Sequence, residues 1–153
     1  DIIDFDQIVE DAKKLFAETL EKKSGQLSAS VEKNASGFTA DRDKISQLIR
    51  NLMDNSIRFS DERCDIRVSI GKTEDDNLEI KVSDNGWGIP DEEKPHLTER
   101  FYRGQLGKKV KGTGLGLALC KEIAAMYGGS ISFESKVGEG TTVKVILPFR
   151  RKE

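Results

Sequence analysis

One stretch decides the fold of this chain: residues 51–59, which read NLMDNSIRF. It closes a longer segment in which apolar residues recur at helical spacing, namely Ile45, Leu48, Ile49, Leu52 and Met53. This i, i+3, i+4, i+7, i+8 pattern predicts an amphipathic helix with one buried face. An Asp at position 41 is a suitable N-cap, so we expect the helix to begin there.

The same helix carries a polar stripe. At ~100° per residue, Asn51, Asn55 and Arg58 fall within about 60° of one another. Two asparagines in one stripe need a reason, because Asn is a poor helix former. An amide oxygen suits a magnesium ion whose charge phosphates already balance, and a guanidinium can bind a phosphate oxygen. The alternative is a solvated helix face with incidental amides.

A second stretch, residues 84–90, reads DNGWGIP and follows the alternating residues of a half-buried strand that ends at Ser83. Asp-Asn-Gly can form a hairpin turn. However, residues 89–95 show no alternation and contain two prolines, so we expect a loop. Glycines allow the backbone to approach a flat ligand, and Asp84 could accept a hydrogen bond from an exocyclic amine.

A third stretch, residues 112–117, reads GTGLGL. Its glycines alternate and no lysine follows the last one, so it matches neither the dinucleotide fingerprint nor the phosphate loop. It leads into a predicted helix from about Leu115 to Tyr127, whose first amides could hold a triphosphate. A plain flexible loop is the alternative. Taken in order and spacing, the three stretches predict an ATP site.

These residues resemble the ATP-binding catalytic domain of sensor histidine kinases. That domain has the Bergerat-type fold, which is also found in type II topoisomerases, mismatch-repair ATPases and heat-shock chaperones. The resemblance covers nearly the whole chain. It implies a single catalytic domain over residues 1–153, with an ATP lid over about 91–112. It also implies that Mg-ATP donates its terminal phosphoryl group to a histidine on a dimerisation domain that is absent here and expected upstream.

The resemblance assigns residues to the site. It implies that Asn55 binds magnesium, that Asn55 and Arg58 are catalytic, and that Asp84 binds the adenine amino group. Thr141, in the last turn, would face the adenine-bound water. The implied nucleotide-binding residues are Asn51, Asn55, Arg58, Phe59, Asp84, Gly86, Gly88, Ile89, Tyr102, Arg103, Gly112, Thr113, Gly114, Leu115, Gly116, Leu117 and Thr141.

Some residues depart from the family pattern. Arg58 and Phe59 stand where lysine and tyrosine are usual, and both keep the charge or the ring. Thr98 stands where phenylalanine is usual, and the lid is short, with eight residues between Arg103 and Gly112. The run ERFYR at 99–103 is the feature that separates such kinases from their hydrolytic relatives.

Hydrophobic periodicity predicts the remaining elements. A first helix runs from Asp6 to about Lys22, with one apolar face formed by Ile8, Ala12, Leu15, Phe16 and Leu20. Alternation predicts strands around 27–31, 38–39, 66–70, 78–82, 131–133 and 143–147. Three helices and one sheet imply a two-layer α/β sandwich, with a mixed sheet covered on one face and solvated on the other.

Composition agrees with one domain. The chain has 153 residues, is 36% hydrophobic and carries a net charge of −2, which predicts no attraction to nucleic acid. Cys64 and Cys120 lack metal-binding spacing and fit reduced, cytosolic thiols. The sequence shows no signal peptide and no membrane-spanning run. We therefore expect a cytoplasmic domain without direct membrane contact, either free or as the cytoplasmic part of a membrane-bound sensor. Because the chain begins at Asp1 without methionine, we interpret it as part of a longer protein.

Two other functions remain open at this stage. In a hydrolytic ATPase, Asp54 would activate water beside the magnesium-binding Asn55. In a switch or anti-sigma kinase of the same fold, the acceptor would be a serine of a partner protein. For a histidine kinase the partners would be the histidine-bearing domain and a downstream response regulator. The single histidine, His96, is not expected to be the acceptor, because Pro90 and Pro95 tether its segment to the pocket wall.

Overall fold

The structure is a computed structural model that describes residues 1–99 and 116–151. The helices are α1 (Phe5–Lys22), α2 (Arg42–Arg58) and α4 (Gly116–Met126), with short 3-10 helices η1 (Lys33–Ala35) and η2 (Asp91–His96). The strands are β1 (Gln26–Val31), β2 (Asp65–Lys72), β3 (Asn77–Ser83), β4 (Ser130–Lys136) and β5 (Gly140–Pro148).

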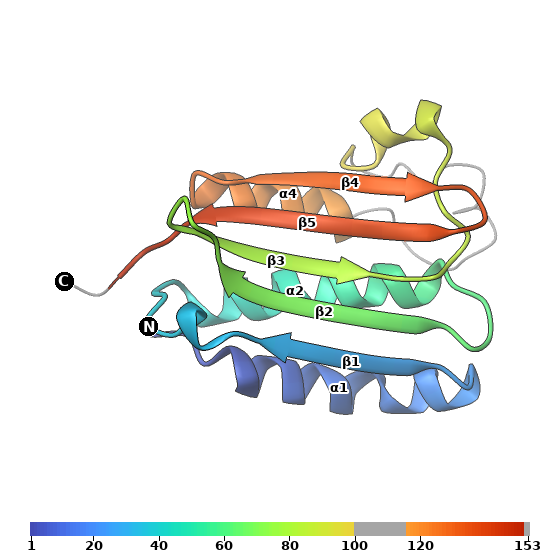
Figure 1. The fold of residues 1–153 in the computed structure, drawn as a ribbon, viewed down its shortest axis with the longest axis horizontal. Helices are drawn as coiled ribbons and strands as arrows, with labels where there is room; N and C mark the ends of the chain where they lie inside the picture. Colours follow the sequence, from blue (N-terminus) through green and yellow to red (C-terminus); the bar gives the residue numbers. More distant parts are fainter. Residues whose placement is uncertain (100–115, 152–153) are drawn as a thin grey trace.

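These strands form one mixed sheet in the order β1-β2-β3-β5-β4. β1 pairs parallel to β2, and the other neighbours pair antiparallel. α1, α2 and α4 all lie on one face of the sheet (Figure 1). The predicted two-layer α/β sandwich is therefore confirmed.

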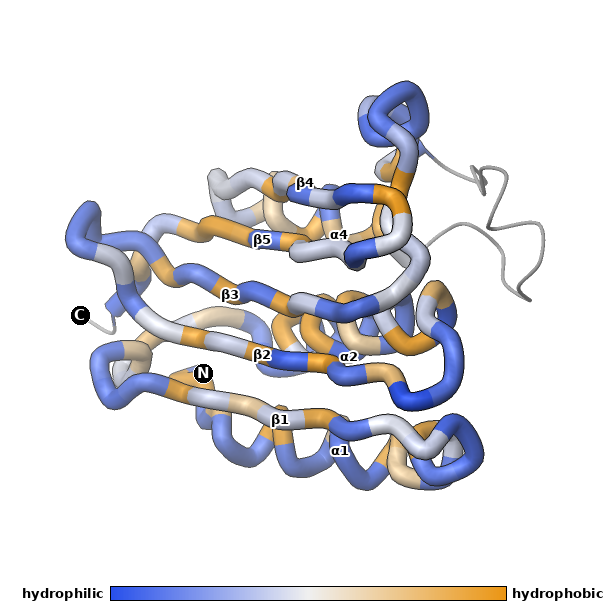
Figure 2. Tube along the Cα trace, turned by 45° about the vertical axis from the view of Figure 1, so that its right-hand side comes forward, coloured by the Kyte–Doolittle hydropathy of each residue, from blue (hydrophilic) through white to orange (hydrophobic). Residues whose placement is uncertain are grey.

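The solvated face of the sheet follows from strand alternation. Along β2, Ile66, Val68 and Ile70 are buried under the helices, whereas Arg67 and Ser69 are exposed. The tube in Figure 2 shows the same alternation of hydrophobic and hydrophilic residues along β3 and β5. Period-two patterning thus decides which face the helices cover.

α2 is the central helix of the core. Its five predicted core residues are fully buried, namely Ile45, Leu48, Ile49, Leu52 and Met53. The Asp41 carboxylate caps its start by accepting hydrogen bonds from the main-chain N–H groups of Asp43 and Lys44, at 2.9 and 3.2 Å. Burial of each large apolar side chain is worth about 1.5–3 kcal/mol. α2 is therefore held firmly where the polar residues at its end can be positioned.

Two local predictions were wrong. Leu15 does not join the buried face of α1, and its side chain is 60% exposed. The reason is that α1 packs over β1, the edge strand of the sheet, so no further strand lies beyond to cover the margin of the helix. Residues 38–39 do not form a strand either. They make isolated bridges, Phe38 with Arg151 and Thr39 with Ile2, which tie the two ends of the described chain together.

None of the helices in the described ranges has the length and apolar character that a bilayer crossing requires.

The exposure of α1 side chains gives a direct test of the packing. Leu20→Ala removes a side chain that is 7% exposed, whereas Leu15→Ala makes the same chemical change at a site that is 60% exposed. We expect Leu20→Ala to lower the free energy of unfolding by about 2–5 kcal/mol. Leu15→Ala should change it by no more than about 0.5 kcal/mol. Urea denaturation measures both, and equal losses would contradict the position of α1.

Candidate functional site

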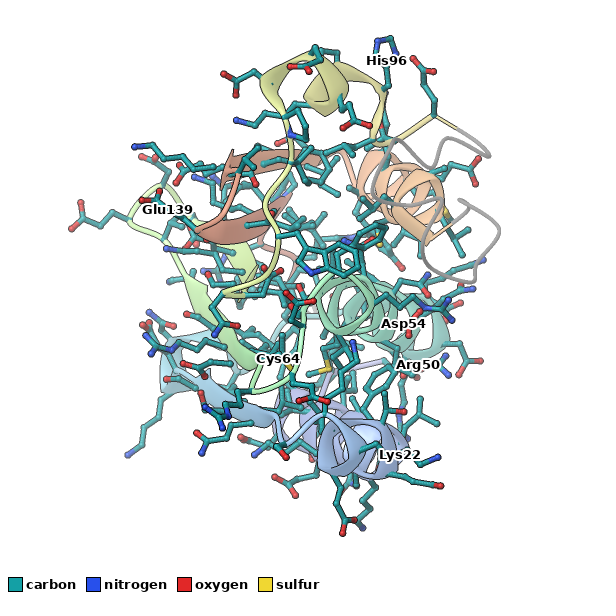
Figure 3. The ribbon with its side chains drawn as sticks, turned by 90° about the vertical axis from the view of Figure 1, so that its right-hand side faces the viewer. Lys22, Arg50, Asp54, Cys64, His96 and Glu139 are labelled. Atoms are coloured by element: carbon teal, nitrogen blue, oxygen red, sulfur yellow. The ribbon has the colours of Figure 1, made fainter. Side chains whose placement is uncertain are left out.

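The carboxyl ends of α2 and β3 and the amino end of α4 lie at the same end of the molecule (Figure 1). Figure 3 looks directly at this end, where the loop with Cys64 and the turn with Glu139 face the viewer. Because β5 runs antiparallel to β3, its first residues lie beside the last residues of β3. Two of the predicted stretches and Thr141 thus meet in space.

Asp84 is fixed immediately after β3. Its Oδ1 accepts hydrogen bonds from the main-chain N–H groups of Gly86 at 2.9 Å and Thr141 at 3.1 Å. Its own N–H donates to the Thr141 carbonyl at 2.9 Å. Both main-chain donors bind Oδ1, and no hydrogen bond of full geometry from the described residues reaches Oδ2. The side chain is therefore held by one oxygen and keeps the other for a further donor.

Desolvation raises the pKa of the Asp84 carboxyl above its ordinary value. The N–H groups of Gly86 and Thr141 oppose this rise, because they favour the charged form. The nearby Ser56 hydroxyl also lowers the pKa, although its oxygen makes no hydrogen bond of full geometry within the described part of the chain. Desolvation outweighs the effects of these three donors, so Asp84 is a partly desolvated hydrogen-bond acceptor.

Two glycines let the main chain close around Asp84. A Cβ on Gly86 would collide with the Phe59 carbonyl, and a Cβ on Gly140 would collide with the Asp84 carbonyl. Gly140 also has a φ of +123°, which favours glycine. Gly86 and Phe59, both predicted site residues, are therefore in close contact across the site.

α2 presents the predicted polar stripe at the same end. Asn51 has a buried Nδ2 without a hydrogen-bond partner among residues 1–99 and 116–151. Asn55, one turn further on, is half-buried. Arg58 donates from Nε to Asp54 Oδ2 at 2.8 Å, so the neighbouring carboxylate orients the guanidinium. An unpaired buried amide costs about 1–3 kcal/mol, which a polar ligand would recover.

A lysine directly after α1 secures the end of α2. Lys23 Nζ donates to the carbonyls of Ile57 at 2.7 Å and Ser60 at 2.8 Å. The last carbonyls of a helix lack partners within it, and a cation there also favours the helix dipole. Lys23 therefore fixes the turn that leads from Arg58 into Phe59.

Sequence reasoning missed two polar residues of this region. Ser135 Oγ accepts from the Ile89 N–H at 2.8 Å and lies 2.7 Å from Thr141 Oγ1. Only the pairing of β4 with β5 places it there. Ser56 carried a visible signal, because it continues the buried face of α2 at i+3 and i+4 from Met53 and Leu52. A single hydroxyl on an otherwise apolar helix face is a pattern that the sequence alone shows.

Other predicted residues stand as follows. Ile89 and Gly88 lie beside β4, where Gly88 packs against the main chain of Lys136. Gly116 begins α4 and Leu117 is 8% exposed. The remainder lie outside the described residues: Tyr102, Arg103, Gly112, Thr113, Gly114 and Leu115.

The predicted lid, about 91–112, is described only in its first part. Residues Asp91–His96 form η2, and Lys94 Nζ anchors it by donating to the Ser135 carbonyl at 2.8 Å and to Asp91 Oδ1 at 2.6 Å. η2 is therefore tied to the β4 edge of the sheet, beside the segment that carries Gly88.

A hollow of about 500 Å³ lies elsewhere, beside Asp1 and Arg150. It is lined by Asp1, Thr39, Ala40, Asp41, Asp43, Tyr127 and Arg150. None of these is a predicted site residue.

Within the described part of the chain, Asp84 Oδ2 has no donor and Asn51 Nδ2 has no acceptor, and both fit a ligand that brings a hydrogen-bond donor and polar oxygens. An adenine nucleotide has both, with the amine on the base and oxygens on the phosphates. For magnesium, the oxygen of the Asn55 amide is a suitable donor. The residues present therefore fit the expected ligands.

Comparison with known proteins identifies the family and the fold. The model of the family "Histidine kinase-, DNA gyrase B-, and HSP90-like ATPase" matches residues 40–151. Sensor histidine kinase YkoH of Bacillus subtilis is 44% identical over 106 residues, which are 68% of this chain and 23% of that protein. A nucleotide-free catalytic domain of histidine kinase ThkA superposes with a TM-score of 0.79 at 26% identity, covering 95% of this chain and 94% of that one. Full-length ShkA in complex with AMPPNP superposes with a TM-score of 0.83 at 20% identity, covering 99% of this chain and 31% of that one.

The fold and the family match define an ATPase-type domain built on a helix-covered sheet. The chain belongs to the histidine kinase-, DNA gyrase B- and HSP90-like ATPase family, and it has the catalytic domain of sensor histidine kinases. It spans about a fifth to a third of the length of the curated relatives it matches.

The raised pKa of Asp84 predicts a pH dependence of stability. The folded state binds this proton more tightly than the unfolded state, so stability is lost as pH rises from about 3.8 through the folded pKa. Asp84→Asn keeps an oxygen for the two N–H donors and removes the charge. As pH rises from 4 to 7, the free energy of unfolding of Asp84→Asn should therefore increase relative to that of the unaltered chain. Urea denaturation without nucleotide measures both.

Asp75→Asn, in the exposed β2–β3 turn, is the matched control and should leave the pH dependence unchanged. Parallel pH profiles for Asp84→Asn and the unaltered chain would contradict the desolvation of Asp84.

Proposed function

We propose that this chain binds Mg-ATP between the end of α2 and the end of β3 and donates the terminal phosphoryl group to a histidine of a separate dimerisation domain. The observation that carries the proposal is the arrangement around Asp84, a half-buried carboxylate with one oxygen held by Gly86 and Thr141 and the other open. The likeness in fold to ShkA, whose structure was solved with AMPPNP, supports a nucleotide as the ligand.

Asp84 recognises the base in this proposal. Its open Oδ2 accepts from the exocyclic amine of adenine, while Gly86 and Gly88 allow the main chain to lie against the ring. Thr141 stands beside Asp84, and the hydroxyls of Thr141 and Ser135 are 2.7 Å apart, which gives that wall of the site a polar edge for a base-bound water.

α2 recognises the triphosphate. Asn55 holds the magnesium ion, which would offset the charge of the phosphates. Asn51 donates to a phosphate oxygen from its unpaired amide, and Arg58, oriented by Asp54, supplies positive charge. The amino end of α4 provides further main-chain donors near Gly116. Phosphoryl transfer depends mainly on positioning and charge neutralisation, which these residues supply.

A histidine acceptor is its own nucleophile, so the chain needs no general base. Asp54 is the candidate base of a hydrolytic enzyme, but its Oδ2 accepts from Arg58 at 2.8 Å. That hydrogen bond occupies a carboxylate oxygen that would otherwise be available to accept a proton from water. Transfer to a protein histidine is therefore favoured over hydrolysis.

The partners follow from the same proposal. They are the histidine-bearing dimerisation domain of the parent kinase and a response regulator that receives the phosphoryl group. A structure of ThkA in complex with the response regulator protein TrrA, which this chain matches with a TM-score of 0.78, supports the second partner. We propose a cytoplasmic location for the domain.

The test is phosphoryl transfer in trans. We expect the isolated chain to bind ATP without labelling itself, and to label an added dimeric helical fragment of the parent protein with acid-labile phosphate. His96 is exposed and its Nδ1 lies 2.7 Å from Glu99 Oε1, so His96→Gln is the control variant and should transfer normally.

Three outcomes would contradict the proposal. Self-labelling of the isolated chain that His96→Gln abolishes would make His96 the acceptor. Acid-stable phosphate on a serine would indicate a switch kinase, and sustained release of phosphate into solution would indicate a hydrolytic ATPase.

A further inference from the structure

We infer that Asp61 and Trp87 form a positioning pair that holds the base-recognising loop against the end of α2 and thereby sets nucleotide affinity. The indole Nε1–H of Trp87 donates to Asp61 Oδ1 at 2.6 Å. Neither residue was among the predicted site residues. The inference rests on the proposed nucleotide site, because it assigns these residues a role in its affinity.

Trp87 joins three segments that are distant in sequence. Its main-chain N–H donates to the Phe59 carbonyl at 3.1 Å, and its carbonyl accepts from the Gly138 N–H at 2.8 Å. Both are main-chain hydrogen bonds, so most residues at this position could form them. Proline could not form the first, because it has no main-chain N–H. The side chain adds the bond to Asp61 and an edge-to-face contact with Phe59, with ring centroids 6.0 Å apart. The two side-chain contacts are therefore what the Trp87 indole adds to the main-chain hydrogen bonds of the loop.

The pair lies between the two halves of the site. Asp61 follows the end of α2 at Arg58 by three residues, so it moves with the half that carries the asparagines. Trp87 follows Gly86, whose N–H holds Asp84 Oδ1. A hydrogen bond between them therefore fixes the distance between the α2 end and the Asp84 carboxylate.

The space at the junction is small, which makes the position of the loop critical. Gly86 lies so close to the Phe59 carbonyl and the Ser60 hydroxyl that a Cβ would not fit. A loop that moves away from α2 would carry the Gly86 N–H away from Asp84 Oδ1. The carboxylate would then lose one of the two main-chain hydrogen bonds that orient it, without any change in the residues that touch the nucleotide.

The test uses four variants. Asp61→Ala removes the acceptor, Trp87→Phe removes the donor but keeps a ring for Phe59, and the third variant combines both changes. Asp75→Ala makes the same change as Asp61→Ala in the exposed β2–β3 turn and is the control. Because Asp61 is exposed and water competes for it, we expect each single change to weaken Mg-ATP binding by about threefold to tenfold.

Coupling between the two changes separates a pair from two unrelated effects. The double variant should lose no more affinity than the single variant that binds Mg-ATP less tightly, because the same hydrogen bond is removed in each case. Asp61→Asn retains an acceptor oxygen and should restore most of the affinity. Asp75→Ala should bind as the unaltered chain does. Losses that multiply in the double variant would overturn the pair.

A second readout needs no nucleotide. Trp87 is the only tryptophan of the chain, so the tryptophan emission comes from this position alone. Without ligand, Asp61→Ala should increase quenching of the emission by acrylamide, and Asp61→Asn should not. Increased quenching with unchanged Mg-ATP affinity would overturn the inference while leaving the proposed function intact. Failure of the unaltered chain to bind Mg-ATP would instead overturn the proposed function, and this role with it.

Discussion

The pairing of β3 with β5 is the constraint on which the site depends. It places Thr141 beside Asp84, so that main-chain groups of two distant segments hold one carboxylate oxygen. Because the two strands are central in the sheet and their inward residues are buried, this geometry is backed by the core. Asp84 can therefore remain partly desolvated with its second oxygen open, a state that a loop alone would not maintain.

α2 relates the core to the site through its two faces. One face buries Leu48, Leu52 and Met53 completely, and the other carries Asn51 and Asn55 near the helix end. Lys23 binds one carbonyl in the last turn of α2 and one just beyond it, and the turn that follows contacts Gly86 and Trp87. Burial of the apolar face thus stabilises the helix and thereby positions polar side chains that contribute little to the free energy of folding.

Sequence periodicity was enough for the three helices and the five strands of the sheet, including those that border the candidate site. The buried face of α2, the strand that ends before Asp84 and the start of a helix at the third glycine stretch all follow from local patterns. The resemblance to sensor histidine kinases added Thr141, which no local pattern singles out. Leu15 was misplaced because whether a marginal helix residue is covered depends on where the sheet ends, and that is a property of strand order. Ser135, Asp61 and the role of Trp87 depend on contacts between distant segments, so they could not be read from spacing.

The central claim is that Asp84 and α2 hold different parts of one nucleotide, and a calorimetric titration with two ligands tests it most directly. Asp84→Asn turns the open acceptor into a donor, so it should weaken binding of adenosine and of Mg-ATP alike, by about tenfold or more. Asn55→Ala should weaken Mg-ATP binding and leave adenosine binding largely unchanged, because only the phosphates and the metal lose a partner. Equal losses for both ligands with Asn55→Ala, or unchanged affinities with Asp84→Asn, would contradict the account.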